Sequence, residues 1–240
     1  MLAQADASQL EWRTAVELSN DVVGLQEILD GADTHSLNQV AFSLPSRLIA
    51  KIYLFRTIFR GSGWSFAHDP DFMHVSSSAA FWEDVNEKFY TKYNGLDKQH
   101  KKWAQEVVTG KPIISPLGRQ WPIPLSVKPS GEKYIPMTKL TNYPVQGTGA
   151  DIMSIARVSF MRRLSENKEL KMVKLVSSVH DSIVVDAPAY LKEEICEMFL
   201  AVFADLQKNI HKLFGYEWVT PLGAECKYGP NMKDMVKYNA

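Results

Sequence analysis

The spacing of apolar residues predicts a chain in which helices dominate. Helices are expected at 8–19, 20–30, 35–43, 78–109 with a break at Asn94-Gly95, and 147–166. The stretch "SLPSRLIAKIYLFRTIFRG", residues 43–61, predicts another, with Ser43 or Ser46 as cap and Gly61 as its end. Apolar residues from Leu191 to Leu213 keep helical spacing, so one long helix is expected over about 188–214.

β-Branched residues are concentrated instead in "VKLVSSVHDSIVVDA", residues 173–187. An ionised carboxylate is costly inside a sheet, so His180 and Asp181 are expected at the tip of a hairpin with strands at 173–179 and 183–187. A short strand before Asp6 and a last strand in the terminal "WVTPLGAECKYGPNM" would complete a small sheet. The Gly- and Pro-rich residues 110–140 predict loop with short extended pieces. The predicted class is α+β, with helices on one face of the sheet.

Composition adds little about function. Lys plus Arg and Asp plus Glu both number 27, which argues against a free-standing DNA-coating protein. Cys196 and Cys226 lack metal-ligand or redox spacing, so they are expected to be reduced and structural. No stretch approaches about 18 apolar residues, and the N-terminus lacks the features of a signal peptide. These features predict a cytoplasmic protein without a membrane segment, in the host cytoplasm if its source is viral.

Four residues of the 43–61 helix suggest a ligand-binding face. Arg47, Lys51, Phe55 and Phe59 are spaced four apart, so they follow one side of a helix. Two cations followed by two aromatic rings could hold a triphosphate at one end and a flat base or sugar at the other. The alternative is a solvated basic face beside a pair of core aromatics.

Two aspartates suggest a metal site. Asp6 and Asp181 are each predicted at the end of a strand, where converging carboxylates repel unless a divalent cation lies between them. Mg²⁺ prefers such oxygen ligands, and two metal ions held side by side can catalyse nucleophilic displacement at a phosphorus atom. The alternatives are two unrelated surface aspartates, or Asp6 as a helix-cap residue.

Four segments then occur in a recognisable order: "DASQLEWR", "RLIAKIYLFRTIF", "NYPVQGTGADIM" and "VHDSIVVD". They resemble motif A, motif B, the glutamine-bearing segment and motif C of the family A DNA polymerases. The linking "DGADTHSLNQVAF" and the terminal "PLGAECKYGPNM" are also similar to segments of that family. The resemblance therefore extends over nearly the whole chain. It implies a palm at 1–30 and 126–240, with helical fingers at 31–125.

The resemblance also implies a role for each matching residue. Asp6 and Asp181 would bind two Mg²⁺ ions, with Mn²⁺ as an alternative, and would act in catalysis with Lys51. Glu11 would reject a ribose 2′-OH, and Phe59 would stack near the templating base. The full nucleotide-binding set would be Arg47, Lys51, Phe55, Phe59, His35, Glu11 and Gln9. The residues that contact primer-template DNA would be Arg13, Asn142, Gln146 and His180. The implied reaction is template-directed transfer of a nucleotide from a dNTP to a primer 3′-OH.

Some positions depart from the family pattern. Ser182 replaces a usual glutamate and is similar to single-subunit phage RNA polymerases, which are therefore the alternative enzyme class. Phe59 replaces a tyrosine, Ala7 an aromatic residue and Arg60 a glycine.

The family's thumb, first palm strands and 3′–5′ exonuclease have no counterpart in the sequence. We therefore expect a split, phage-type polymerase in which a second polypeptide supplies the thumb, the remaining palm and, optionally, the exonuclease. On this hypothesis the sheet neighbours of the Asp6 strand come from that partner. A non-catalytic DNA-binding or scaffold subunit is the alternative outside enzymes.

Overall fold

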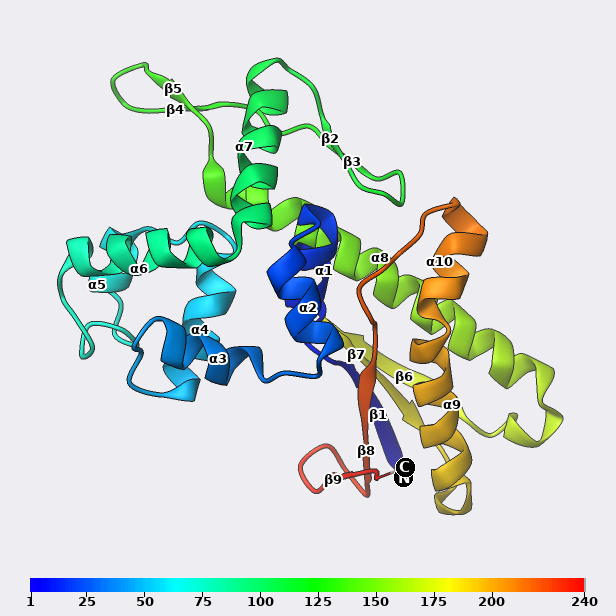
Figure 1. Ribbon diagram of the computed structural model, residues 1–240. Coiled ribbons are helices and arrows are strands. Elements are labelled where there is room, and N and C mark those ends of the chain that lie inside the picture. The colour runs from blue at the N-terminus through cyan, green and yellow to red at the C-terminus, as the bar shows by residue number, and fades with distance from the viewer. Residues whose placement is uncertain (240) are drawn as a thin grey trace. The chain divides into compact units, whose positions relative to one another are not determined.

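The computed structural model describes residues 1–239, which fold as two compact units (Figure 1). Unit 1 contains Met1–Leu10 and the residues from Thr148 onward, and unit 2 contains Glu11–Gly147. These divisions differ from the expected boundaries after residues 30 and 125. The difference arises because Trp12 and Val16 near the start, and Val145 near the end, are buried in the core of unit 2.

Unit 1 is built on an antiparallel five-stranded sheet. Its strand order is β6 (Lys174–Val179), β7 (Ser182–Asp186), β1 (Leu2–Ala7), β8 (Ala224–Gly229) and β9 (Val236–Lys237). The hairpin is therefore confirmed, with His180 and Asp181 between its strands. The expectation that another polypeptide supplies the neighbours of the Asp6 strand is wrong. β1 is the middle strand, paired with β7 on one side and β8 on the other, and its alternating Ala3, Ala5 and Ala7 are buried on one face of the sheet.

Helices cover the sheet of unit 1. α9 (Lys192–Ala204) packs against β1 and β8, and its Phe199 stacks on Phe160 of α8 (Met137–Glu166) at 4.3 Å between ring centroids. The predicted long helix is in fact two, because the chain turns at Asp205 before α10 (Leu206–Phe214). Gly215 ends α10 with φ +67°, a conformation that glycine adopts at little cost. Two short 3₁₀ helices, Lys168–Leu170 and Ala189–Leu191, connect these elements.

Unit 2 is mainly helical. Its helices are α1 (Leu10–Ser19), α2 (Val22–Leu29), α3 (Thr34–Ala41), α4 (Arg47–Thr57), α5 (Gly63–Ala67), α6 (Ala79–Lys92), α7 (Asn94–Val108) and the first part of α8. Two small hairpins pair β2 (Ile113–Ile114) with β3 (Gln120–Trp121), and β4 (Ser126–Val127) with β5 (Lys133–Tyr134). The largest side chains with almost no exposure are aromatic, and they fix α1, α4 and α6 together: Trp12, Tyr53, Trp82, Phe89 and Tyr93.

The start of α8 differs from the sequence prediction. Helix was expected from 147, after a proline-rich loop, but it begins at Met137 and continues through Pro144. A proline inside a helix removes one backbone hydrogen bond and crowds the preceding turn. Burial of Leu140, Thr141 and Val145 on both sides of Pro144 offsets that cost.

Cys196 and Cys226 are both buried free thiols, as expected. Within residues 1–239, none of the helices combines the length and the apolar character that crossing a membrane would require.

Candidate active site

The ends of two neighbouring strands bring Asp6 and Asp181 together in unit 1. Asp6 lies opposite Ser182 in the β1–β7 pairing. The N–H of Ala7 donates to the carbonyl oxygen of Asp181 at 2.8 Å, so the pairing continues to the hairpin tip. Both aspartates are partly exposed. Two carboxylates are thus held on adjacent backbone segments of one rigid sheet.

The tip of the β6–β7 hairpin has an uncommon conformation. His180 is exposed and has a φ of +51°, in the left-handed region that costs energy for a residue with a Cβ. Ser182, which replaces the usual glutamate, is buried, and its hydroxyl donates to the carbonyl of Val179 at 3.0 Å. This hydrogen bond closes the turn that carries His180 and Asp181. Ser182 therefore stabilises the hairpin tip.

α4 carries the predicted nucleotide face in unit 2. Ser46 caps the helix, its hydroxyl accepting the N–H of Ile49, so Arg47 is the first helical residue. Arg47 and Lys51 are exposed, and Phe55 is half-buried one turn further along. The helix ends at Thr57, short of the expected 61, and Phe59 lies in the turn that follows. Only three of the four predicted residues therefore share the helical face.

A left-handed residue ends α4 early. Arg60, at the position where the family usually has glycine, has a φ of +60°. The N–H of Arg60 donates to the carbonyl of Thr57 and that of Gly61 to the carbonyl of Arg56, which is a helix-ending pattern that favours glycine. A side chain at this position must offset roughly 1 kcal/mol or more of strain.

The guanidinium of Arg60 has three partners that provide this compensation. It donates to Asp97 at 2.6 Å and to Nδ1 of His100 at 3.0 Å, and it lies 3.9 Å from the ring centroid of Tyr90. Burial, and secondarily the charge of Arg60, lower the pKa of His100 to about 3, so the ring is neutral and can accept. The turn that bears Phe59 is therefore anchored to α6 and α7.

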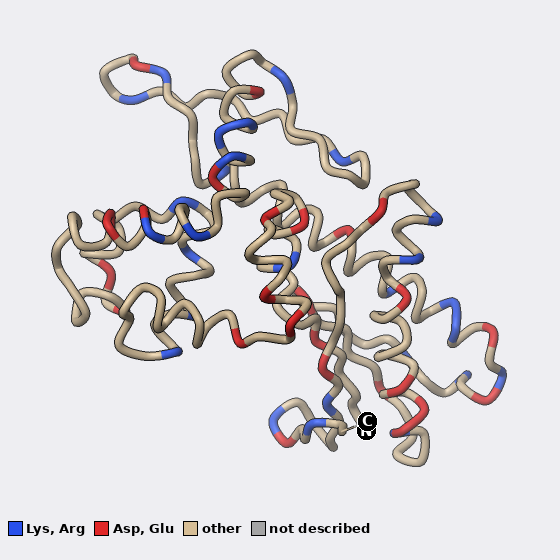
Figure 2. The backbone as a smooth tube through the Cα atoms, viewed as in Figure 1, with Lys and Arg blue, Asp and Glu red and all other residues tan. Residues whose placement is uncertain are grey.

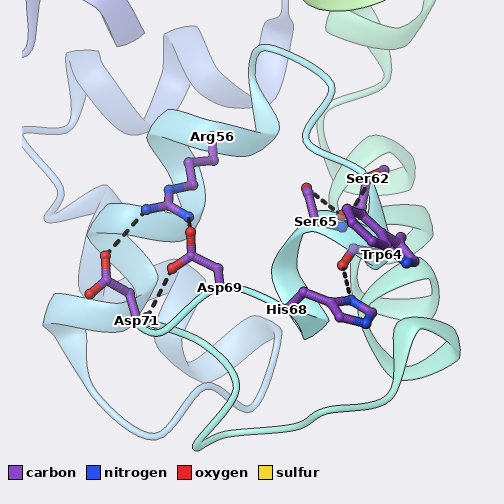
Figure 3. A network of polar contacts seen from close by, with 7 residues as sticks. All are labelled: Arg56, Ser62, Trp64, Ser65, His68, Asp69 and Asp71. Carbon is purple, nitrogen blue, oxygen red and sulfur yellow. Dashed lines mark hydrogen bonds and ion pairs between the residues drawn. The ribbon is translucent and has the colours of Figure 1, made fainter.

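A second arginine fastens the last turn of α4 (Figure 3). Arg56 contacts the carboxylates of Asp69 and Asp71, and Asp69 also accepts the N–H of Asp71 at 2.8 Å. These residues follow α5, whose own start is capped by Ser62. α4 is thus held near its C-terminal end by two arginine networks, while the predicted phosphate-binding residues are at its N-terminal half.

Arg47 has a partner that the sequence analysis did not identify. It makes two hydrogen bonds to Asp33, at 2.6 and 3.0 Å, and its guanidinium holds the pKa of Asp33 well below the usual range. Asp33 is the cap residue that precedes α3, a position that a sequence can suggest but that does not reveal the pairing with Arg47. His35, on α3, is buried with its ring 6.1 Å from that of Phe55. Burial first, and Arg47 second, lower the pKa of His35, so it is neutral near pH 7.

The remaining predicted residues lie near α1 and α8. Nε2 of Gln146 donates to Oε1 of Glu11 at 3.2 Å, which brings the predicted sugar gate and a predicted DNA contact together within unit 2. Asn142 is one turn before Gln146 on α8 and is partly exposed. Burial lowers the pKa of Arg13 on α1. Gln9, in unit 1, has a φ of +52° between β1 and α1.

Comparison with known proteins decides the family. The model of DNA polymerase family A matches residues 1–234. The chain belongs to DNA polymerase family A. Similar proteins include DNA polymerase I of Deinococcus radiodurans, 24% identical over 97% of this chain and 23% of that protein. The DNA polymerase of Mycobacterium phage L5 is 26% identical over 79% of this chain and 28% of that protein.

A solved structure shares the fold. The polymerase domain of Pol1 from M. smegmatis, in complex with a DNA primer-template and dNTP, matches 95% of this chain and 39% of that chain. The TM-score is 0.75 at 20% sequence identity, which supports the mixed α+β fold. The chain spans about a quarter of the length of the D. radiodurans and phage L5 polymerases. The family model that matches is that of DNA polymerases, whereas Ser182 had suggested a likeness to single-subunit RNA polymerases.

Proposed function

We propose that this chain carries the catalytic part of a DNA polymerase, which transfers a nucleotide from a dNTP to the 3′-OH of a primer under the direction of a template. The observation that carries the proposal is the adjacency of Asp6 and Asp181 at the ends of paired strands in a family A chain. In the proposal, unit 1 acts as the palm and unit 2 as the fingers.

The two aspartates fit Mg²⁺, which binds one or two protein carboxylates and takes its other ligands from phosphates and water. Within residues 1–239, no group of three or more His, Cys, Asp or Glu gathers into a metal site. Asp6 and Asp181 would therefore be the protein's contribution to holding two ions, with Mn²⁺ as a substitute. When bound, such ions activate the primer 3′-OH and stabilise the charge that develops on the phosphate oxygens.

The first two turns of α4 would hold the nucleotide. Lys51 is an exposed cation one turn after Arg47, so both charges can reach a triphosphate tail. Phe55 offers a half-buried ring at the next turn, in a position to pack against the sugar and base. Its contact with the buried His35 keeps that ring in place. The order of charge and ring along α4 therefore matches the order of phosphate, sugar and base in a dNTP.

Unit 2 also offers a surface for DNA. Residues 98–139, from α7 through both hairpins, contain eight Lys or Arg and two Asp or Glu (Figure 2). Basic side chains at this density neutralise phosphates and supply most non-specific affinity for nucleic acid. Asn142 and Gln146 on α8 would add DNA contacts in unit 2, and His180 at the hairpin tip would add one in unit 1. A neutral total charge therefore does not exclude a DNA-binding surface.

The proposal is tested by Mg²⁺-dependent extension of a labelled primer on a template, with each dNTP supplied separately. Incorporation should follow the templating base and should stop when the metal is chelated. The competing function, a non-catalytic DNA-binding subunit, predicts a gel shift of the primer-template without incorporation in any combination of metal and partner protein.

Glu11→Ala should relax discrimination against ribonucleotides by about tenfold to a hundredfold, because the carboxylate would no longer occupy the space of a 2′-OH. The measurement is the ratio of kcat/KM for dNTP and rNTP. Glu11→Gln keeps the size of the side chain and should retain most discrimination. Gln146→Ala should shift the ratio in the same direction by less, because it removes the hydrogen-bond partner of Glu11. A wild-type preference for rNTP would favour an RNA polymerase.

We also propose that a second polypeptide completes the enzyme, supplying a thumb and further palm and, optionally, a 3′–5′ exonuclease. β6 supports this, because among residues 1–239 no strand pairs with its outer edge. Met172 is 66% exposed, and Val176 and Val179 are each 53% exposed, around that edge. Exposed strand edges with apolar side chains are usually covered in stable proteins.

The purified chain alone should bind primer-template weakly and extend it poorly, because the thumb would supply many of the phosphate contacts to the duplex. Adding the partner should restore extension and raise the melting temperature of the chain, since binding to the folded state stabilises it. Size-exclusion chromatography followed by primer extension provides the measurement. A monodisperse monomer with robust, processive synthesis would contradict the split-enzyme proposal.

A further inference from the structure

Asp33 occupies the guanidinium group of Arg47, the group that would bind phosphate in the proposed function. Both bonds of the pair join the planar guanidinium to the two carboxylate oxygens, at 2.6 and 3.0 Å. Arginine binds carboxylate and phosphate with the same forked geometry. A triphosphate that contacts Arg47 must therefore displace Asp33 from the same donors.

The structure also shows how Asp33 can release Arg47 without losing its own hydrogen bonds. Its Oδ1 accepts the N–H of His35 at 3.2 Å, and its Oδ2 accepts the hydroxyl of Ser36 at 2.7 Å. Both donors belong to the first turn of α3, which stays capped when Arg47 leaves. The side chains of Arg47 and Asp33 are 55% and 41% exposed, so water screens their attraction and either partner can be exchanged.

We propose that Asp33 is a built-in competitor for Arg47, a counter-ion that a nucleotide's phosphate tail must replace. This rests on the proposed function of α4 and adds a residue that tunes its affinity. Because only the unpaired fraction of Arg47 can receive phosphate, the apparent affinity is lower than the intrinsic affinity by that fraction.

The experiment measures binding of inorganic tripolyphosphate and of a dNTP to the chain by calorimetry, without DNA. Asp33→Asn removes the charge but keeps the size and the ability to cap α3. It should tighten binding by about twofold to fivefold, the range expected for an exposed ion pair. The gain should shrink as salt rises, because screening already weakens the pair in the wild type. In an Arg47→Ala background, Asp33→Asn should change nothing.

Asp69→Asn is the matched control, since Asp69 also pairs with an arginine of α4 and accepts a backbone N–H (Figure 3). It should leave tripolyphosphate binding unchanged. Weaker binding in Asp33→Asn would show that the carboxylate positions Arg47 rather than competing for it. If Asp33→Asn also tightened binding in the Arg47→Ala background, the effect would come only from the loss of a nearby negative charge. Either result overturns the proposal. Absence of binding by both the wild type and Asp33→Asn would overturn it too. Binding that follows the prediction in a chain that never incorporates dNTP would instead refute only the polymerase function.

Discussion

Asp181→Asn should abolish nucleotide incorporation while leaving the fold and DNA binding nearly unchanged. Asn keeps the shape of the side chain, and the backbone bond from Ala7 to residue 181 does not involve the side chain. The variant loses the negative charge that would hold a metal ion. It therefore also loses the stabilisation that this ion would give to the transition state. We expect a loss on the order of 1,000-fold or more in the single-turnover rate. Asp6→Asn should have an effect of the same size.

Asp186→Asn is the matched control, because it removes a carboxylate from the same sheet at the opposite end of β7. Asp186 is exposed and pairs with the N-terminal ammonium group at 3.5 Å. Incorporation by this variant should match the wild type, and all three variants should melt at similar temperatures. Substantial incorporation by either Asp6→Asn or Asp181→Asn, with the complete enzyme, would refute the two-metal assignment.

The sequence predicts the hairpin and its tip well because two rules act together there. β-Branched residues favour strands, and the cost of burying a charge places His180 and Asp181 in the turn. The sequence does not predict which strands lie beside β1, because strand pairing joins segments that are far apart in the chain. Six residues carry no information about which distant segments flank them, and only the structure shows β7 and β8 on either side.

Helix ends show a second limit of prediction from sequence. α4 ends before Phe59 because Arg60 adopts a left-handed conformation, which side-chain contacts with Asp97, His100 and Tyr90 compensate. Propensity alone would place such an ending at Gly61. The Asp33–Arg47 pair is likewise invisible in sequence, since 14 residues separate its members.

Lys51→Ala should lower kcat/KM for dNTP by about tenfold to a hundredfold, because a hydrogen bond from a charged group to phosphate contributes roughly 1.5–3 kcal/mol. Lys51 differs from Arg47 in having no hydrogen-bond or ion-pair partner within residues 1–239. Its charge is therefore available without displacing a carboxylate. Both KM and kcat should worsen, since the phosphates carry negative charge in the ground state and in the transition state.

The control is Lys88→Ala, which removes an exposed lysine from α6 of the same unit, where it pairs with Asp84. Lys88→Ala should leave both kinetic constants unchanged. Primer-template affinity, measured by gel shift, should be similar in both variants and the wild type. If Lys51→Ala instead weakened DNA binding and left the KM for dNTP unchanged, α4 would contact the DNA backbone. The order of phosphate, sugar and base proposed along α4 would then be wrong, although the aspartate site of unit 1 would be unaffected.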